Sequence, residues 1–343
     1  MSYYDGTKLL SLKDINGNTP EIYICTSNRS AGKTTYFNRL CVNRFLKNAE
    51  KFALIYRYNY ELDDIVDKFF KDIQGLFFSN HNMTAKKRAK GIYQELFIDD
   101  IPCGYAISLN SADSLKKYSH LFSDVSRMIF DEFQSETNHY CAEELRKFQS
   151  VHKSIARGQG KMVRRVPVYM LSNPVTILNP YYVAFGISTR LREDTVFLRG
   201  DGFVCEQGFN QDAHDAQIDS GFNRAFSSDS YQSYSNEGIY LNDSKSFLDK
   251  PIGKSRYLCT LKYKGKEYAV REYAEQGIIY ADDRVDSTFP FRLVVTVNDH
   301  DINYVMLKRN DVFISSLRYF FEKGCFRFKD LECKDAILAV LSY

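Results

Sequence analysis

The sequence of 343 residues has no tryptophan, no C-x-x-C pair and no histidine at the spacing of a zinc ligand. No uncharged run approaches the roughly 18 residues that a membrane-spanning helix needs, and the first eight residues contain no apolar leader. We therefore expect a soluble, intracellular protein whose eight cysteines are reduced and mostly buried. The net charge of +3 is too small to indicate a nucleic-acid partner by itself, so such a partner must meet local basic clusters.

The chain is too long for one average domain and suits two. From residue 21 to about 190, short apolar runs alternate with helical patterns, which predicts an α/β domain with a largely parallel sheet. The expected strands are 21–26, 52–57, 125–130 and 166–171, with an inserted hairpin formed by 94–99 and 101–109. The expected helices are 34–48, 61–71 and 141–156.

Residues 206–250 are rich in Asn, Ser, Asp, Gln and Gly and cannot bury a core of their own, so this stretch is predicted to be a linker or lid. Alternating patterns return at 257–264, 267–273, 277–281 and 291–297, followed by a helical run at 311–322. The expected organisation is an α/β domain at 1–205, the linker or lid at 206–250, and a smaller α+β domain at 251–343.

A phosphate-binding loop is the most informative motif. The strand at 21–26 runs into small residues that close on Gly-Lys-Thr, an order that aims backbone N–H groups at an anion. The predicted nucleotide-binding residues are Ser27, Asn28, Arg29, Ser30, Ala31, Gly32, Lys33, Thr34 and Thr35. Lys33 would reach the β- and γ-phosphates, and the Thr34 hydroxyl is placed for Mg²⁺. The usual pattern has glycine where Ser27 stands, and the alternative interpretation is a structural junction between a strand and a helix.

Two adjacent carboxylates, Asp131 and Glu132, follow an apolar strand. In a nucleotide-hydrolysing site the first completes the Mg²⁺ shell and the second polarises the attacking water. The alternative is an acidic junction that favours the dipole of the next helix. Glu132 favours an ATPase over a kinase, because a kinase must keep water away from the γ-phosphate.

A third strand, at 166–171, leads into Ser172 and Asn173 before a proline. If this strand lies between the phosphate-loop strand and the acidic strand, Asn173 can contact the γ-phosphate and act as a sensor. The alternative is an ordinary turn capped by Ser-Asn.

Basic residues cluster in three segments, and their spacing in the sequence does not determine their roles. Arg157 lies in a glycine-broken basic stretch after a helix, which fits either a solvated helix end or an arginine finger acting on a neighbouring subunit. Lys86–Lys90 and the pair Lys116 and Lys117 fit either solvated faces or nucleic-acid contacts.

Five short blocks keep their order and approximate spacing between about 20 and 185. They are Arg29–Thr34, Asn43–Lys47, Arg57-Tyr58 with Glu61-Leu62, Phe130–Phe133, and Leu171–Asn173 with Asn179–Tyr181. Together they resemble the DNA-packaging ATPases of phi29-like tailed phages, which drive double-stranded DNA into a preformed capsid. Beyond residue 185 the similarity is thin, although Phe326–Phe328 echoes the family.

The resemblance implies an ATPase domain of the additional-strand class and a C-terminal domain like a ribonuclease H fold that has lost nuclease activity. It implies ATP and Mg²⁺ as cofactors, and a homopentameric ring on the capsid portal, docked at the procapsid vertex in the host cytoplasm, often with a structural RNA. Carried over by position, Glu132 is the catalytic carboxylate, Asp131 and Thr34 hold Mg²⁺, and Arg157 acts in trans. Lys116, next to Lys117, falls near a lysine that links DNA gripping to nucleotide state.

Two departures from the family pattern limit this transfer. Ser27 replaces the first loop glycine, and the strand at 257–263 has no central carboxylate of the kind that a two-metal nuclease needs. We expect no nuclease, with Asp282, Asp283 and Asp311 at turn and cap positions. The competing hypotheses are a P-loop small-molecule kinase and a nucleotide-gated scaffold that binds nucleic acid.

Overall fold

The structure is a computed structural model that describes residues 3–63, 69–137, 139–157, 160, 162–188, 190–191, 195–225, 248–307 and 311–342. The chain divides into two compact units. The first comprises residues 1–187 and 191–242, and the second 188–190 and 243–343. Residues 206–225 of the expected linker or lid are therefore grouped with the first unit. None of the helices in the described part of the chain is both long and apolar enough to cross a membrane.

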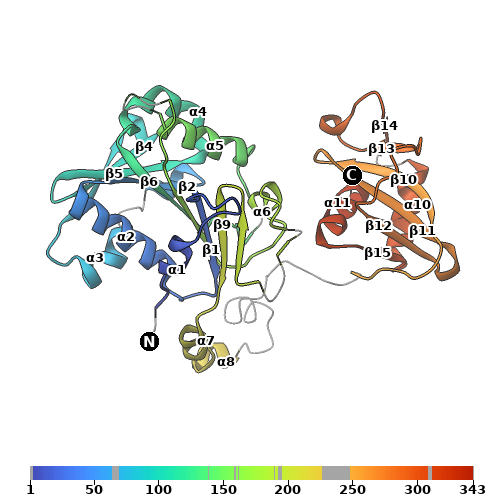
Figure 1. The fold of residues 1–343 in the computed structure, drawn as a ribbon, viewed down its shortest axis with the longest axis horizontal. Coiled ribbons are helices and arrows are strands. Elements are labelled where there is room, and N and C mark those ends of the chain that lie inside the picture. Colours follow the sequence, from blue (N-terminus) through green and yellow to red (C-terminus); the bar gives the residue numbers. More distant parts are fainter. Residues whose placement is uncertain are drawn as a thin grey trace. The chain divides into compact units, whose positions relative to one another are not determined.

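The described strands of the first unit form one sheet in the order β3-β4-β5-β2-β6-β7-β1-β9-β8 (Figure 1). The central strands are parallel and comprise β5 (Ile101–Ser108), β2 (Lys51–Tyr56), β6 (Val125–Asp131), β7 (Val168–Ser172), β1 (Ile22–Ser27) and β9 (Phe203–Gly208). Antiparallel strands flank them, namely β3 (Met83–Arg88), β4 (Tyr93–Ile98) and β8 (Phe197–Gly200). The strand predicted at 166–171 is β7, and it lies between β1 and β6.

Helices cover both faces of this sheet, because its central strands are apolar on both sides. In β1, Tyr23 and Cys25 pack with α1 (Thr7–Ser11), α2 (Lys33–Asn48) and α3 (Lys71–Phe77). Ile24 points the other way, into the core shared with α4 (Ala112–Leu115), α5 (Glu144–Ile155) and α6 (Pro180–Ala184). Figure 1 shows α2 and α3 on the opposite side of the sheet from α4 and α5.

The α/β prediction is confirmed, and the four predicted parallel strands lie within two residues of their expected bounds. The hairpin is confirmed as well, because β4 and β5 turn at Asp99 and Asp100, whose φ angles of 51° and 62° suit a two-residue turn. Of the helix predicted over 61–71, residues 64–68 lie outside the described residues. The described ones form the end of a 3₁₀ turn, Asn59–Leu62, and a π-helical segment at 69–70 that runs into α3 at Lys71.

The second unit holds a sheet in the order β14-β13-β10-β11-β12-β15. Strands β10 (Arg256–Tyr263), β11 (Lys266–Tyr273) and β12 (Ile278–Asp282) form an antiparallel meander. Parallel strands extend it on both sides, namely β13 (Arg292–Val294) and β14 (Val305–Met306) beyond β10 and β15 (Phe326–Phe328) beyond β12. Residues of α10 (Val312–Glu322) and α11 (Leu331–Ser342) share its apolar core.

The three acidic residues singled out in this unit take structural positions. Asp311 caps α10 by accepting the Phe313 N–H at 2.8 Å, and Asp282 accepts the Arg284 N–H in the turn after β12. Asp283 forms an ion pair with Lys329. Turn and cap roles are thereby confirmed for Asp282 and Asp311.

Candidate nucleotide site

The phosphate-binding loop connects the carboxyl end of β1 to the start of α2. Ser30 and Gly32 have φ angles of 61° and 94°, so the chain passes twice through the left-handed region before the helix begins at Lys33. This turn leaves the first backbone N–H groups of α2 facing the loop, which is the geometry that binds anions. Ser27, where the usual pattern has glycine, is the last residue of β1 and pairs with Gly208 of β9, so a glycine opposite it provides room.

Lys33, the first residue of α2, is almost fully buried, with 7% of its surface exposed. Its Nζ donates to the Asn173 side-chain oxygen at 2.7 Å and approaches the Ser27 carbonyl at 3.4 Å. Burial lowers the pKa of Lys33, and the nearby charges of Asp131 and Glu132 oppose that shift. The structure thus places the predicted sensor, Asn173, in direct contact with the predicted phosphate-binding lysine.

Asp131 ends β6 on the other side of β7. Its carboxylate accepts the Thr34 hydroxyl and, at 3.0 Å, the Glu132 N–H. Burial, together with the charge of Glu132, raises the pKa of Asp131 to about 6, although Lys33 opposes the shift. Carboxylate and hydroxyl oxygens are the ligands that Mg²⁺ prefers, so the paired oxygens of Thr34 and Asp131 fit this ion.

Glu132 follows in the left-handed conformation, with a φ of 53°, and its carboxylate is exposed. Such a backbone is unusual for a residue with a side chain and is found where surrounding contacts impose it. The next residue is anchored, because the Phe133 N–H donates to the Leu171 carbonyl at 3.2 Å. Glu132 is therefore turned out of the sheet, while Asp131 before it belongs to β6 and Phe133 after it is hydrogen-bonded to β7.

Two cavities meet at Glu132. One, of about 560 Å³, is also lined by Arg29, Gln134 and Asn173. The other, of about 380 Å³, is also lined by Thr34 and Asp131. Glu132 belongs to both walls and so stands between the side that holds Thr34 and Asp131 and the side that holds Asn173.

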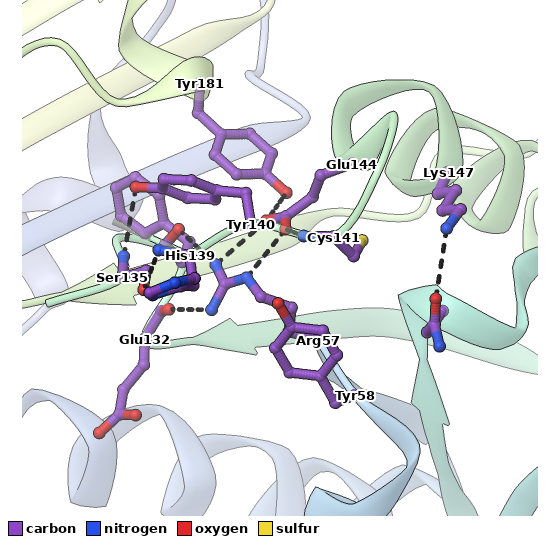
Figure 2. Close-up of polar contacts among 12 residues, drawn as sticks. Arg57, Tyr58, Glu132, Ser135, His139, Tyr140, Cys141, Glu144, Lys147 and Tyr181 are labelled. Carbon is purple, nitrogen blue, oxygen red and sulfur yellow. Dashed lines mark hydrogen bonds and ion pairs between the residues drawn. The ribbon is translucent and has the colours of Figure 1, made fainter. Parts of the chain in front are cut away.

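Arg57, at the carboxyl end of β2, fixes the backbone around Glu132 (Figure 2). Its guanidinium donates to the Phe133 carbonyl at 2.8 Å and to the Glu132 carbonyl at 3.4 Å. It also forms a two-point ion pair with Glu144, at 2.8 and 3.0 Å. Both side chains are buried, so this is a charge pair in a low-dielectric environment.

Glu144, the first residue of α5, also bonds to two further parts of the chain. It accepts the Cys141 N–H at 2.9 Å and the Tyr181 hydroxyl of α6 at 2.9 Å (Figure 2). The Arg57 guanidinium also lies 5.0 Å from the centre of the Tyr140 ring. The sequence prediction assigned no role to Arg57 or Glu144. The available signal was a charged residue that ends the apolar run of β2.

Segments distant in sequence hold the phosphate-binding loop from outside. The Tyr4 N–H donates to the Ala31 carbonyl at 2.8 Å. On the other side, Asn28 accepts the Asn210 N–H at 2.9 Å just before α7 (Gln211–Ile218), and Gln217 donates to the Ser30 hydroxyl at 2.9 Å. The short helix α8 (Gly221–Ala225) follows α7. Part of the predicted lid is therefore bonded to the loop.

The remaining predicted residues take different positions. Arg29 forms an ion pair with Glu136 at the edge of the larger cavity, and Thr35 lies in the first turn of α2. Arg157 is exposed two residues after α5 ends at Ile155. Arg164 donates to the Ile155 carbonyl and to the Val125 carbonyl at the start of β6, so this end of α5 lies at the opposite end of β6 from Asp131. Lys116 and Lys117 are exposed in a 3₁₀ segment, where Lys116 pairs with Asp113 at 2.9 Å.

A protein-family model, described as Podovirus DNA encapsidation protein (Gp16), matches residues 1–341. The chain belongs to this family. Among relatives of the DNA encapsidation family, the DNA packaging protein of Bacillus phage phi29 is 25% identical over 330 residues, covering 95% of this chain and 93% of that protein. The DNA packaging protein of Bacillus phage B103 is 26% identical over 306 residues, covering 88% of this chain and 90% of its own length.

Solved structures show the same fold. The bacteriophage Phi-29 viral genome packaging motor assembly contains a chain that superposes with a TM-score of 0.71 at 24% identity, covering 99% of this chain and 97% of that chain. The Phi-28 gp11 DNA packaging motor gives a TM-score of 0.59 at 15% identity, covering 99% of this chain and 97% of that chain. The resemblance inferred from the sequence motifs is confirmed, and this member of the encapsidation family acts in viral genome packaging.

Proposed function

We propose that this protein is an ATPase that couples hydrolysis to the movement of double-stranded DNA into a preformed capsid. The observation that carries the proposal is the meeting of three strand ends. Lys33 after β1, Asn173 after β7, and Asp131 with Glu132 at the end of β6 converge, with Lys33 and Asn173 in contact. A phosphate-binding loop with an adjacent acidic strand end is the arrangement that hydrolyses a nucleotide.

Each side chain has a distinct role in this mechanism. The loop N–H groups and Lys33 bind the phosphates, and Thr34 and Asp131 would hold Mg²⁺, which supplies charge neutralisation at the phosphate oxygens. Glu132, exposed between the two cavities, orients a water and accepts its proton. Asn173 now accepts a hydrogen bond from Lys33, and a bound γ-phosphate would compete for that lysine, which gives Asn173 a way to sense the nucleotide.

The catalytic assignment is tested by Glu132→Gln. We expect turnover to fall by roughly 10²–10⁴-fold, the usual contribution of a general base, while binding of a fluorescent ATP analogue is retained. Glu143→Gln is the matched control, because Glu143 is exposed and pairs only with Arg146 among the described residues. Unchanged turnover in Glu132→Gln would remove the proposed catalyst.

Arg157 is proposed to act on the nucleotide of a neighbouring subunit. Helix α5 begins beside Arg57 and ends by Val125, where Arg164 donates to both the Ile155 and the Val125 carbonyls. Val125 starts the seven-residue strand β6 that ends at Asp131, so the far end of α5 lies about 20 Å from the proposed catalytic carboxylates. Arg157 is therefore too far from its own phosphates to contact them. An Arg157→Ala protein mixed with a Lys33→Ala protein should recover part of the ATPase activity, and no recovery at any ratio would contradict a role in trans.

The nine-stranded sheet supports assignment to the additional-strand class, because β7 separates the phosphate-loop strand from the acidic strand. In the second unit, the meander with β13 parallel to β10 supports a fold like that of ribonuclease H. Strand β10 carries no carboxylate, and no group of three or more His, Cys, Asp or Glu side chains within the described ranges is arranged to hold a metal ion. We propose that this domain is not a nuclease.

The assembly proposed for this chain is a homopentameric ring on the capsid portal at the procapsid vertex in the host cytoplasm, with a structural RNA as a further partner. Arg157 supports a closed ring, since a residue that acts in trans needs a neighbour at every site. Mass measurement of the protein with an ATP analogue and DNA together tests this. A species that remains monomeric under those conditions would contradict it.

A further inference from the structure

Among the described residues, the basic run Lys86–Lys90 contains one lysine, Lys90, that neither a carboxylate nor an aromatic ring contacts. On β3, Lys87 pairs with Asp63 at 2.7 Å, Arg88 pairs with Glu95 at 2.8 Å, and the Lys86 ammonium lies 4.7 Å from the centre of the Phe97 ring. Lys90 differs from all three. It is exposed, and among the residues that the structure describes none forms a hydrogen bond, ion pair or cation–π contact with it.

The backbone presents Lys90 at a strained turn. Ala89, Lys90 and Gly91 have consecutive positive φ angles of 49°, 59° and 88°. Left-handed alanine and lysine are uncommon and cost energy, and such strain gathers where a chain must present a group in a fixed direction. The turn is short and lies between paired strands β3 and β4, so Lys90 projects from a rigid support.

Lys90 lines a cavity of about 480 Å³ together with Asn59, Tyr60, Asp63 and Lys87. Two lysines and one carboxylate leave this wall with a net positive charge. The side chains of Lys87 and Asp63 are both exposed to solvent. Exposed ion pairs are weak, so a phosphate can replace Asp63 as the partner of Lys87. Asn59 is not available to a ligand through its oxygen, which already accepts hydrogen bonds from Ser108 and Ser111.

Tyr60 connects this cavity to the nucleotide site. It is 69% exposed and lines both the Lys90 cavity and the 560 Å³ cavity that contains Glu132. Its ring stacks on Tyr58, with centroids 5.5 Å apart and an interplanar angle of 11°. Tyr58 follows directly after Arg57, which holds the Glu132 backbone. A ligand that presses on Tyr60 would therefore act on the segment that positions the proposed catalyst.

We propose that Lys90, with Lys87 and Tyr60, binds the phosphate backbone of double-stranded DNA. This inference rests on the proposed function. The ligand class follows from charge, since an unneutralised lysine on a rigid turn beside a second, exchangeable lysine suits a regularly spaced phosphate chain. It needs no base recognition, because phosphate contacts carry no sequence information. This contact lies on a different segment from Lys116 and Lys117, the lysines that the sequence resemblance pointed to.

The test is fluorescence anisotropy of a mixed-sequence DNA duplex with the full chain, titrated at several salt concentrations. Each phosphate contact contributes about 0.9 to the slope of log affinity against log salt, so losing one contact at 0.1 M salt weakens binding roughly eightfold. Lys90→Ala should have a smaller slope and a lower affinity than the wild type, and Lys90→Arg should restore both the wild-type slope and the wild-type affinity. Lys86→Ala is the matched control, since its ammonium lies over Phe97, and its slope should equal that of the wild type.

The outcomes separate this inference from the proposed function. If the wild type shows no salt-dependent DNA binding, the proposed function itself fails. If the wild type binds and Lys90→Ala has the same affinity and slope, the Lys90 site is refuted while the proposed function stands. A duplex RNA that competes better than DNA and loses its advantage in Lys90→Ala would overturn DNA as the occupant. An unchanged thermal unfolding midpoint in Lys90→Ala shows that a loss of binding is not a loss of folding.

Discussion

The ion pair between Arg57 and Glu144 makes a quantitative prediction. The side chains are 8% and 2% exposed, and the pair is supported by the Cys141 N–H and the Tyr181 hydroxyl. Glu144→Gln removes the charge while keeping the shape, so the Arg57 guanidinium is left buried without a counter-charge. Breaking a buried pair in this way costs about 3–5 kcal/mol. Because glutamine can still accept the Cys141 N–H, we expect the lower end, about 3 kcal/mol.

The same substitution should also reduce hydrolysis. Arg57 holds the carbonyls of Glu132 and Phe133 only while its own position is fixed, and the left-handed Glu132 backbone relies on such contacts. Glu144→Gln should therefore lower kcat of the ATPase with a smaller change in KM, since the phosphate-binding loop is not altered. Arg57→Met should do the same, and the double variant should lose less stability than the sum of the single losses.

Urea unfolding followed by tyrosine fluorescence, with steady-state ATPase assays, measures both effects. Tyr181→Phe is the matched control. It deletes one hydrogen bond to the Glu144 carboxylate while leaving the ion pair, and should cost about 1.5 kcal/mol. A loss below about 1 kcal/mol in Glu144→Gln, with kcat unchanged, would refute the idea that this pair supports the Glu132 loop.

Three further predictions follow from single features. The pKa of Asp131 is raised to about 6, so its carboxyl takes up a proton as the pH falls through 6. Mg²⁺ affinity, measured by calorimetry with ADP, should therefore be constant above pH 7 and fall about tenfold per pH unit below 6. An affinity that stays constant down to pH 5 would disprove this. Gly104→Ala should destabilise the first unit by about 3 kcal/mol, because the new Cβ would lie 2.2 Å from the Phe52 carbonyl oxygen. Gly75→Ala in α3 places its Cβ in open space and should be neutral or stabilising. Equal unfolding midpoints for the two variants would contradict this packing. The second unit should leave supercoiled DNA intact with Mg²⁺ or Mn²⁺, and cleavage that Asp282→Asn abolishes would overturn its assignment as a domain without nuclease activity.

The central strands were predictable because they are buried on both faces and appear as continuous apolar runs. Strand β9 escaped prediction because it contains Glu206, whose carboxylate is buried against the Tyr4 hydroxyl, a pairing across 202 residues. Strand β3 escaped for a different reason. Its Lys86–Arg88 segment is polar because it is an edge strand, where lysines block unwanted pairing.

The site was predictable as a set of residue types but not as a set of contacts. Phosphate loops and acidic strand ends have local patterns, so Lys33, Asp131, Glu132 and Asn173 could be named from the sequence. The Lys33–Asn173 hydrogen bond depends on β7 lying beside β1, which is a property of the sheet. Arg57 and Glu144 are 87 residues apart, and neither has a pattern that points to the other.

The contacts that hold the phosphate-binding loop have a consequence for the order of folding. Ser30 bonds to Gln217, which is 187 residues later in the chain, and Asn28 bonds to Asn210, 182 residues later. Contacts at such sequence separation form late, because the intervening chain must first be ordered. During synthesis, the loop cannot take its final form until Gln217 has left the ribosome, even though its own residues are among the first translated. A nascent chain halted before residue 210 should therefore bind nucleotide poorly, and the ability to do so should appear abruptly once α7 emerges.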